Sequence, residues 1–294
     1  MPLKIIILLL YALLALPVSA QTKRALVIGL GQQKDRNWGK INGDKDVGYV
    51  RQYLQEANFK NVTTLINRQA TKQGISSAFR RLTAACRLGD VVYIHFSGHG
   101  QQMLDMHRDE TDGLDECWIP YDAYRYACKE DRGEKHLTDD EVNVWLNAIR
   151  DKVGDRGRIL VVIDACHSGD ATRDDGRETT RGVGDIFKAM ASLITDAADN
   201  GITAADKAVP LPERWITLSA CRSDQKNSEM RKPAVGKLTY AIHSILKTRP
   251  QCGNVDFLKL IRKFVYANAG KYPQTPVMTG EGVNKYRITD ILSK

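Results

Sequence analysis

The sequence predicts an α/β fold, with helices flanking a mostly parallel central β-sheet, and two patterns carry that prediction. Short apolar runs rich in β-branched residues alternate along the chain with segments whose apolar residues recur every three or four positions, the spacing of one helix face. Parallel neighbours in a sheet need a crossover connection, which is usually a helix. The 294 residues contain no internal repeat and no Pro-rich linker, so we expect one domain.

The predicted strands are continuous apolar runs, typical of strands that are buried on both faces. They cover residues 24–30, 62–66, 91–96, 159–163 and 215–218. A Gly-rich loop follows the first run and marks where that strand ends. Because helical segments separate most of these runs, we expect them to lie parallel in one sheet.

The predicted helices show apolar residues along one face. They cover residues 44–57, 71–86, 139–153, 238–246 and 255–266. In the first of them Val47, Val50 and Leu54 follow helical spacing, and Thr71 is a plausible N-cap of the second. These helices supply the crossovers and the layers that cover the sheet.

Composition excludes several classes of protein. Hydrophobic residues make up 43% of the chain, which is ordinary for a globular protein and excludes disorder. Six cysteines are too few for a disulfide scaffold. The formal net charge is +8, but no basic run is interleaved with aromatic residues, so we expect no nucleic-acid partner. The excess Lys and Arg is expected to be solvated surface.

Residues 1–20 have the layout of a secretory signal peptide. A short basic start, Met1–Lys4, precedes an apolar run over residues 5–16, and small residues lead up to Ala20. This run is shorter than the roughly 20 residues that span a bilayer, so we expect no stable membrane anchor, although an uncleaved anchor is the alternative. The mature domain is then 21–294, and the protein is expected to be secreted or periplasmic.

One segment of this domain differs from the rest in composition. Residues 169–211 are rich in Asp, Arg, Gly and Ala, and we expect them to form a mobile surface insertion. Arg173, Arg177, Arg181 and Lys188 lie on it.

Two predicted strands end in residues that can carry chemistry. His99 follows the strand 91–96, and Cys166 follows the strand 159–163. Reactive groups gather beyond the carboxyl ends of the strands in parallel sheets. A cysteine thiolate is a nucleophile, and a histidine can move its proton. The amides of Gly100 and Cys166 are then placed to stabilise an oxyanion.

Either residue alone would more often be structural, because a buried cysteine usually acts as a small hydrophobe. A zinc site is not supported, since no Cys or His pair has the spacing of zinc ligands. The two strand ends together predict covalent catalysis by a cysteine nucleophile.

At these residues the sequence resembles a known family. HFSGHG at 95–100 and DACHSG at 164–169 closely resemble the caspase-like cysteine peptidases of family C14, nearest the metacaspase and bacterial orthocaspase branch. Further matching stretches are INGDKDV at 41–47, DGLDE at 112–116, TDDE at 138–141, SAC at 219–221 and QTP at 274–276. The resemblance implies a caspase-haemoglobinase sandwich and a cysteine endopeptidase that works through a thioester acyl-enzyme, with His99 and Cys166 as its catalytic dyad.

Charge predicts which peptide bond is cut. Asp164 lies two residues before Cys166, near the place where the side chain of the substrate's P1 residue is expected to enter. P1 is the residue on the amino side of the cleaved bond. A carboxylate about 4 Å from a cationic P1 group is worth about 4 kcal/mol at an effective dielectric of 20. The resemblance implies an acidic S1 pocket that matches Asp46, Ser97 and Asp164. We therefore expect protein or peptide substrates cut after Arg or Lys, although Asp46 also suits a helix first turn.

The resemblance further implies a calcium ion, held by carboxylates that match Asp115, Asp139 and Asp140. Oxygen ligands suit this hard cation. The family's further acidic ligand has no clean counterpart, although Asp174 lies close. Thr138–Glu141 also fits a helix cap with an acidic first turn, so calcium stays an open expectation. No organic cofactor is expected.

The residues and the resemblance leave several points open. An Arg/Lys-specific peptidase could cut its own insertion, and a disulfide between Cys117 and Cys128 is conceivable. We expect a monomer. One alternative function is an Arg-specific peptidase of the clostripain or gingipain type. The other is a catalytically inactive caspase-like module that binds partners, which the presence of both His99 and Cys166 disfavours.

Overall fold

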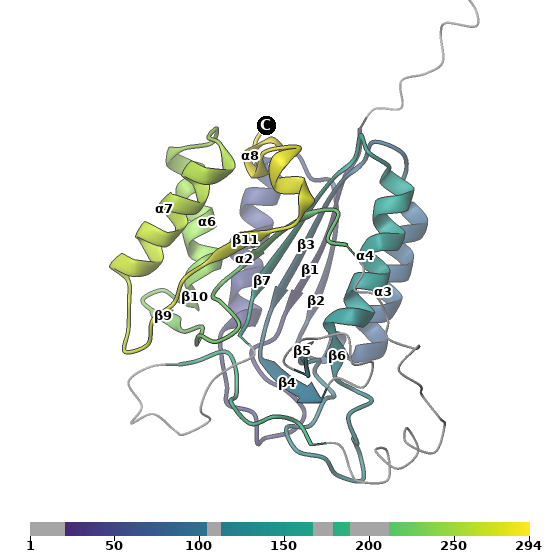
Figure 1. Ribbon diagram of the computed structural model, residues 1–294, viewed down its shortest axis with the longest axis vertical. Coiled ribbons are helices and arrows are strands. Elements are labelled where there is room, and N and C mark those ends of the chain that lie inside the picture. The colour runs from purple at the N-terminus through teal and green to yellow at the C-terminus, as the bar shows by residue number, and fades with distance from the viewer. Residues whose placement is uncertain (1–20, 105–112, 167–178, 189–211) are drawn as a thin grey trace, which may run out of the picture.

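The computed structural model describes residues 21–104, 113–166, 179–188 and 212–294 (Figure 1). A six-stranded sheet lies at its centre in the order β11-β8-β7-β3-β1-β2. Its strands are β1 (Lys23–Gly29), β2 (Asn61–Ile66), β3 (Val91–Ser97), β7 (Arg158–Asp164), β8 (Ile216–Ser219) and β11 (Val277–Thr279). All neighbours pair in parallel except β11 with β8, which is antiparallel.

Helices cover both faces of this sheet. One face carries α2 (Gly43–Glu56), α6 (Lys237–Thr248), α7 (Asn254–Ala267) and α8 (Ile288–Leu292), and the other carries α3 (Lys72–Ala85) and α4 (Asp139–Val153). Two short 3-10 helices, η1 (Asn67–Gln69) and η2 (Glu281–Asn284), join elements. Alternate residues of each central strand therefore enter different cores, which explains why these strands are apolar at nearly every position.

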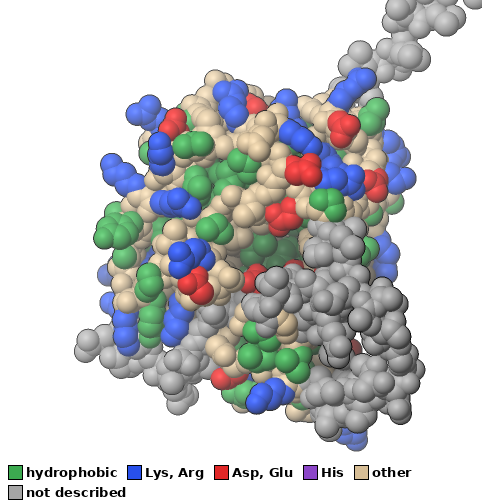
Figure 2. Space-filling model, viewed as in Figure 1, with side chains coloured by type: hydrophobic (Ala, Val, Ile, Leu, Met, Phe, Trp, Pro, Cys, Tyr) green, Lys and Arg blue, Asp and Glu red, His purple; other side chains and the backbone are tan. Residues whose placement is uncertain are grey.

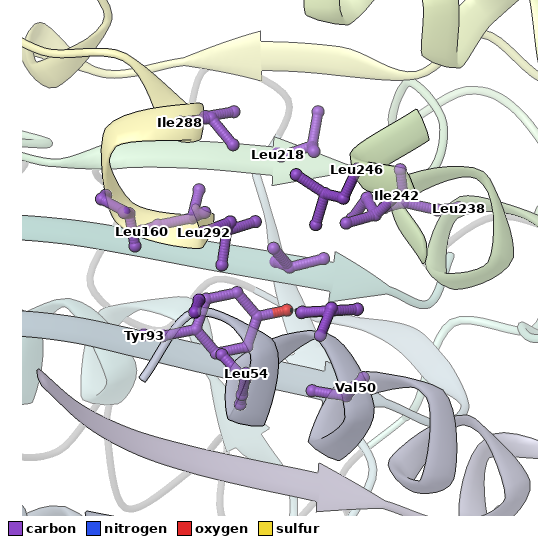
Figure 3. Packing of buried hydrophobic residues seen from close by; sticks show 14 of the residues in the cluster. Val50, Leu54, Tyr93, Leu160, Leu218, Leu238, Ile242, Leu246, Ile288 and Leu292 are labelled. Atoms are coloured by element: carbon purple, nitrogen blue, oxygen red, sulfur yellow. Dashed lines mark hydrogen bonds between the residues drawn. The ribbon is translucent and has the colours of Figure 1, made fainter. Parts of the chain in front are cut away.

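The core around α2 and α6 illustrates this packing. Val50 and Leu54 of α2, Tyr93 of β3 and Ile242 of α6 meet between the helices and the sheet (Figure 3). Val50 and Leu54 lie on the buried face of α2, with the helical spacing that the sequence pattern indicated. Burial of these side chains supplies the main stabilisation of the domain.

Two smaller β-structures stand beside the main sheet. One is an antiparallel sheet of β4 (Gly100–Leu104), β5 (Leu114–Trp118) and β6 (Leu137–Thr138), and the other is a hairpin of β9 (Glu229–Arg231) and β10 (Ala234–Gly236). Neither was predicted, because these strands are two to five residues long and have no regular alternation. Both flank the carboxyl end of the main sheet, so they shape the site there.

Most sequence expectations on the fold are confirmed. Each predicted strand and helix is present within two residues of its expected ends. Thr71 caps α3 by accepting a hydrogen bond from the amide of Gly74 (3.0 Å). The cysteines all lie in the described ranges and form no disulfide, so Cys117 and Cys128 are not linked.

The surface and the termini add three facts. On the face shown in Figure 2, Lys and Arg side chains are scattered among acidic and apolar ones rather than gathered in one patch. No helix in the described part of the chain is long and apolar enough to cross a membrane. The predicted signal peptide, residues 1–20, lies outside the described residues.

Candidate active site

His99 and Cys166 lie at the ends of two adjacent strands. β3 and β7 pair in parallel with Ser97 opposite Asp164, and both chains leave the sheet just beyond that pair. His99 is 3% exposed and Cys166 is 1% exposed. The site is therefore formed where the sequence predicted it, at the carboxyl edge of the sheet, but it is almost closed to solvent.

The His99 ring is held in one orientation. Its Nε2 lies 2.7 Å from the carbonyl oxygen of Gly39, and because a carbonyl only accepts, Nε2 carries the proton of the neutral ring. Nδ1 has no hydrogen-bond partner among the residues that the structure describes. Trp38 packs against the ring with centroids 5.2 Å apart. Burial lowers the pKa of His99 to about 4, so Nδ1 is a free base at neutral pH.

Two backbone amides of the site point at the same oxygen. The amide of Gly100 donates to the carbonyl oxygen of Arg181 at 3.1 Å, and that of Cys166 donates to the same atom at 3.2 Å. These are the two residues expected to stabilise an oxyanion. Their common acceptor is a peptide carbonyl of the chain itself.

The side chain of Arg181 enters an acidic pocket beside this pair. Its Nη1 lies 2.7 Å from Asp46 Oδ2 and 3.3 Å from Asp164 Oδ1. Nη1 also donates to the hydroxyl of Ser97 at 2.6 Å. The three residues expected to line an S1 pocket thus converge from α2, β3 and β7 on one guanidinium. Arg181, Asp46 and Asp164 are each 0% exposed.

Sequence reasoning missed a third carboxylate of this pocket. Glu229 of β9 accepts from Arg181 Nε at 3.0 Å and lies 2.9 Å from Nη2. The amide of Asn42 donates to Glu229 at 2.7 Å and fixes the carboxylate in place. Glu229 is far from the other pocket residues in the sequence and lies on a three-residue strand. No motif or periodicity in the sequence therefore indicated its place in the pocket.

Backbone and hydroxyl donors support the pocket carboxylates from behind. Thr239 at the start of α6 donates its amide and its hydroxyl to Asp164 Oδ2 at 2.9 and 2.6 Å. Asn227 donates to Asp164 Oδ1 at 2.8 Å, and the Gly236 amide donates to Asp46 Oδ1 at 2.9 Å. A Cβ on Gly236 would lie 2.2 Å from Asp164 Oδ2, so only glycine fits there.

The pKa values follow from this arrangement. Burial raises the pKa of Asp46 to about 6, against the lowering effect of the Arg181 charge. Burial also acts to raise the pKa of Asp164, but the Arg181 charge and hydrogen bonds from Thr239 and Asn227 hold it below its usual range. The surrounding carboxylates raise the pKa of Arg181 although burial opposes this. The guanidinium is therefore a permanent cation in this pocket.

Residues around Arg181 run through the site as an extended chain. The Arg181 amide donates to the carbonyl oxygen of Asn227 at 2.8 Å, and the Glu229 amide donates to that of Thr179 at 2.9 Å. Beyond Arg181 the chain pairs in parallel with β4, through a bridge between Gly182 and Gly100. The chain thus lies in the site as an added β-strand would.

This finding corrects the expectation of a surface insertion for residues 179–188. Arg181 is 0%, Val183 5% and Phe187 1% exposed, because ion pairs and apolar contacts draw the segment into the domain. Lys188 is exposed. Residues 167–178 and 189–211, which include Arg173 and Arg177, lie outside the described residues.

Cys221 is a second thiol beside Cys166. A hydrogen bond with Cys166, followed by burial, raises the pKa of Cys221 well above its usual value, so this thiol stays protonated. Its Sγ lies 3.4 Å from the carbonyl oxygen of Gln225. Cys221 therefore packs as a neutral neighbour of the site.

Two of the carboxylates expected to bind calcium, Asp115 and Asp139, lie near each other. Cys117 of β5 pairs with Thr138 of β6, so Asp115 is on the strand beside the one that leads into Asp139 and Asp140. After burial, the charges of Asp139 and Asp115 raise the pKa of Cys117, which means that both carboxylates face this region. In the described ranges, however, no group of three or more His, Cys, Asp or Glu side chains has the geometry of a metal site.

The alternative interpretation of residues 138–141, a helix cap with an acidic first turn, is confirmed. The Thr138 hydroxyl accepts from the Glu141 amide at 3.3 Å, and the Glu141 carboxylate accepts from the Thr138 amide at 3.3 Å. This reciprocal pair is a capping box at the start of α4. Asp174, the remaining candidate near the nucleophile, lies outside the described residues.

Comparison with known proteins agrees with this site. Residues 23–175 match the family model of the metacaspase peptidase C14 domain. The chain belongs to the metacaspase family. It is therefore a cysteine-type peptidase, a hydrolase that acts on proteins, and this result disfavours the inactive binding module. The match to a metacaspase model also favours this branch over the clostripain or gingipain alternative.

Relatives and solved structures support the assignment. The chain is 28% identical to Metacaspase-1 of Schizosaccharomyces pombe over 301 residues, 87% of this chain and 67% of that protein. It is 28% identical to Metacaspase-1A of Aspergillus oryzae over 302 residues, 88% of this chain and 67% of that protein.

In fold this metacaspase is similar to caspase-1 of Spodoptera frugiperda, with a TM-score of 0.58, 12% identity and 89% of each chain covered. A protein of Geobacter sulfurreducens is also similar, with a TM-score of 0.62 and 22% identity, covering 93% of this chain and 97% of that one. These two likenesses establish the caspase-like sandwich.

Proposed function

We propose that this metacaspase cleaves peptide bonds after arginine or lysine and that it processes its own chain at the bond between Arg181 and Gly182. One observation carries the proposal: the Arg181 guanidinium fills an acidic pocket, while the Arg181 carbonyl oxygen accepts from the backbone amides of Gly100 and Cys166. Arg181 is thus bound as a P1 residue would be. Asp46, Ser97, Asp164 and Glu229 form the S1 pocket in this proposal.

The catalytic pair in this proposal is His99 and Cys166. His99 Nδ1 takes the thiol proton of Cys166 as Sγ attacks the carbonyl carbon of the P1 residue. The carbonyl oxygen gains negative charge, which the amides of Gly100 and Cys166 stabilise. The carbon–nitrogen bond then breaks, and His99 returns the proton to the leaving amine. A thioester remains on Cys166 until water attacks it.

The orientation of His99 supports this role. Because Nε2 donates to the Gly39 carbonyl, the lone pair of the neutral ring is at Nδ1. A ring with a pKa near 4 is unprotonated before substrate binds, so it can accept the thiol proton. The position of Cys166 Sγ also fits, since it lies 2.5 Å from where a Cβ of Gly182 would be, beside the bond to be cut.

The S1 pocket favours arginine over lysine. Arg181 uses Nε, Nη1 and Nη2 on three carboxylates at once, a planar fork that a lysine ammonium cannot reproduce. An aspartate at P1 would place a fourth negative charge among these buried carboxylates. Repulsion of about 4 kcal/mol per pair at 4 Å excludes it.

Coumarin amides that carry Arg, Lys or Asp at P1 test the specificity. We expect Arg to be cut fastest, Lys more slowly and Asp at no measurable rate, with no cleavage by a Cys166→Ala variant. Cys221→Ala is the matched control, because it removes the neighbouring thiol and should retain activity. Faster cleavage after Asp than after Arg would overturn the proposal.

We also propose that Ca²⁺ supports activity through Asp115, Asp139 and Asp140. Their carboxylate oxygens are suitable donors for this cation, and Asp115 and Asp139 face one region between β5 and the start of α4. Titration of EGTA into the Arg-amide assay tests this proposal. Full activity at excess chelator would contradict a role for calcium in activity.

For the mature protein we propose export with removal of residues 1–20, and a monomer in solution. The basic start and the apolar run of twelve residues support export. N-terminal sequencing should find Gln21 in the exported protein, and light scattering should give the mass of one chain. An intact Met1 in the exported protein would favour an anchor instead.

A further inference from the structure

The segment that follows Arg181 is bound as closely as Arg181 itself. Residues 182–187 run parallel to β4, with bridges from Gly182 to Gly100 and from Phe187 to Met103. If Arg181 is P1, as proposed above, then Gly182 is P1′ and Val183 is P2′, the first two residues of the leaving group. We propose that this peptidase selects glycine at P1′ and a small aliphatic residue at P2′.

The P1′ restriction comes from the nucleophile itself. A Cβ on Gly182 would lie 2.2 Å from the carbonyl oxygen of Cys166 and 2.5 Å from its Sγ. Neither atom can give way, because the oxygen belongs to the backbone and Sγ is the attacking atom. Any residue with a side chain must therefore shift the peptide bond away from Sγ, which costs reactivity.

The P2′ preference comes from an apolar pocket that Val183 fills. Val183 is 5% exposed, and it packs in one cluster with Trp38, Cys117, Ile119 and Ala123. The Trp38 indole donates to the Ala123 carbonyl at 3.1 Å, so this wall is fixed. A charged residue would lose its hydration here without gaining a partner. A large aromatic one would not fit a pocket already filled by valine.

Backbone pairing connects these subsites to the catalytic step. The Val183 amide donates to the carbonyl oxygen of Gly100 at 3.3 Å, while the Gly100 amide donates to the Arg181 carbonyl. One glycine of β4 thus contacts the chain on both sides of the bond. A leaving group that seats its P2′ residue also aligns the scissile carbonyl with the oxyanion-stabilising amides.

Two further residues of the segment mark where the restriction ends. The Asp185 carboxylate pairs with Arg125 at 2.7 Å, but its side chain is 49% exposed, so this contact contributes little. Phe187 is buried against His136 with ring centroids 4.3 Å apart. It anchors the enzyme's own chain beyond the reach of a short peptide, so we confine the inference to P1′ and P2′.

Quenched peptides of sequence Thr-Thr-Arg-Gly-Val-Gly test the inference on the self-processed enzyme. Replacing Gly by Ala at P1′, or Val by Lys at P2′, should each lower kcat/KM about tenfold or more, an effect of about 1.4 kcal/mol. Replacing the first Thr, which corresponds to the exposed Thr179, is the matched control and should change little. Equal rates for the Gly and Ala peptides, or for the Val and Lys peptides, would overturn the inference.

An Arg coumarin amide separates this inference from the proposed function, because it has no residue at P1′ or P2′. If the amide is cut while the peptides show no discrimination, only the inference fails. If neither amide nor peptides are cut, the proposed function fails.

An Ala123→Leu variant narrows the P2′ pocket and should shift the preference from Val toward Gly. The ratio of the two rates is independent of how much enzyme folds. An unchanged ratio would contradict the pocket assignment.

Discussion

The proposed catalytic pair and the proposed S1 pocket lie side by side at the ends of β3 and β7, but burial has different effects on His99 and on the pocket. Burial lowers the pKa of His99 to about 4, so its ring is uncharged at neutral pH. The pocket, equally buried, surrounds one guanidinium with Asp46, Asp164 and Glu229. Desolvation acts on both, and in the pocket ion pairs and hydrogen bonds offset it and keep the ions in place.

This difference explains the division of labour. A neutral His99 ring can accept a proton without first losing a stabilising ion pair. A pocket with buried carboxylates suits the cationic P1 residue that we propose for it. We therefore expect changes to the pocket charges to affect substrate binding and stability most strongly.

The largest effect is expected for Asp164→Asn. This change removes one buried charge 3.3 Å from the guanidinium while it keeps the side-chain shape. Truncating one side of a buried ion pair costs about 2–5 kcal/mol, so kcat/KM for the Arg amide should fall at least about thirtyfold. The control is Asp151→Asn, an exposed carboxylate on α4, which should leave the rate unchanged. Equal rates for both variants would mean that Asp164 does not bind P1.

Removing Arg181 should destabilise the uncut chain. In a Cys166→Ala background, which prevents cleavage, Arg181→Ala leaves three buried carboxylates without their cation. We expect a loss of about 3 kcal/mol in the free energy of unfolding, measured by urea titration. Arg222→Ala, an exposed arginine, should leave the midpoint in place. If both variants unfold at the same urea concentration, the guanidinium does not hold this segment.

Acid should weaken folding through the buried histidines. Burial lowers the pKa of His95 and His99 to about 4 and that of His136 to about 3. Between pH 6.5 and 4 the unfolded chain binds protons that the folded chain does not, so stability falls as pH falls. Each pKa unit is worth about 1.4 kcal/mol. Urea midpoints of the Cys166→Ala variant at pH 7.5 and 5 measure this, and a higher midpoint at pH 5 would contradict it.

On acidification, binding of arginine in the proposed S1 pocket should weaken at a higher pH than the pH at which His99 gains a proton. The pKa of Asp46 is raised to about 6, so below pH 6 it is protonated and the pocket carries one negative charge fewer. We expect KM for the Arg amide to rise about tenfold between pH 7 and 5, a tenfold change per 1.4 kcal/mol. An Asp46→Asn variant should be weak but should lack this acid limb. If the limb persists in the variant, another group causes it.

An effect of similar size is expected for Glu229→Gln. Glu229 contacts Nε and Nη2 of Arg181, but a glutamine can keep the bond from Nε. We expect kcat/KM to fall about tenfold for the Arg amide, or about 1.4 kcal/mol, and less for the Lys amide. Glu281→Gln, which changes an exposed carboxylate, is the control and should leave the rate unchanged. A larger loss for Lys than for Arg would reverse the assignment of Glu229 to guanidinium recognition.

Much of the fold could be predicted because its main sheet is buried on both faces. Strands such as β3 have no exposed position, so they read as uninterrupted apolar runs, and helix caps such as Thr138 mark the ends between them. Glu229 could not be found in this way. It reaches the pocket through a three-residue strand whose pairing depends on the tertiary structure.

The position of Arg181 was equally hidden. The sequence contains four basic residues between 169 and 188, and nothing local distinguishes the one that enters the pocket. Its place follows from two contacts that are distant in sequence, to Asp46 and to Glu229. Composition therefore indicated a solvated insertion, whereas tertiary ion pairs draw part of it inside.

Mass spectrometry of the purified full-length chain tests the central claim most directly. Incubated at neutral pH with and without calcium, the protein should yield a fragment whose N-terminus is Gly182. The same fragment should be missing from the Cys166→Ala variant and from Arg181→Ala. An active enzyme whose bond between Arg181 and Gly182 stays intact under both conditions would contradict the account.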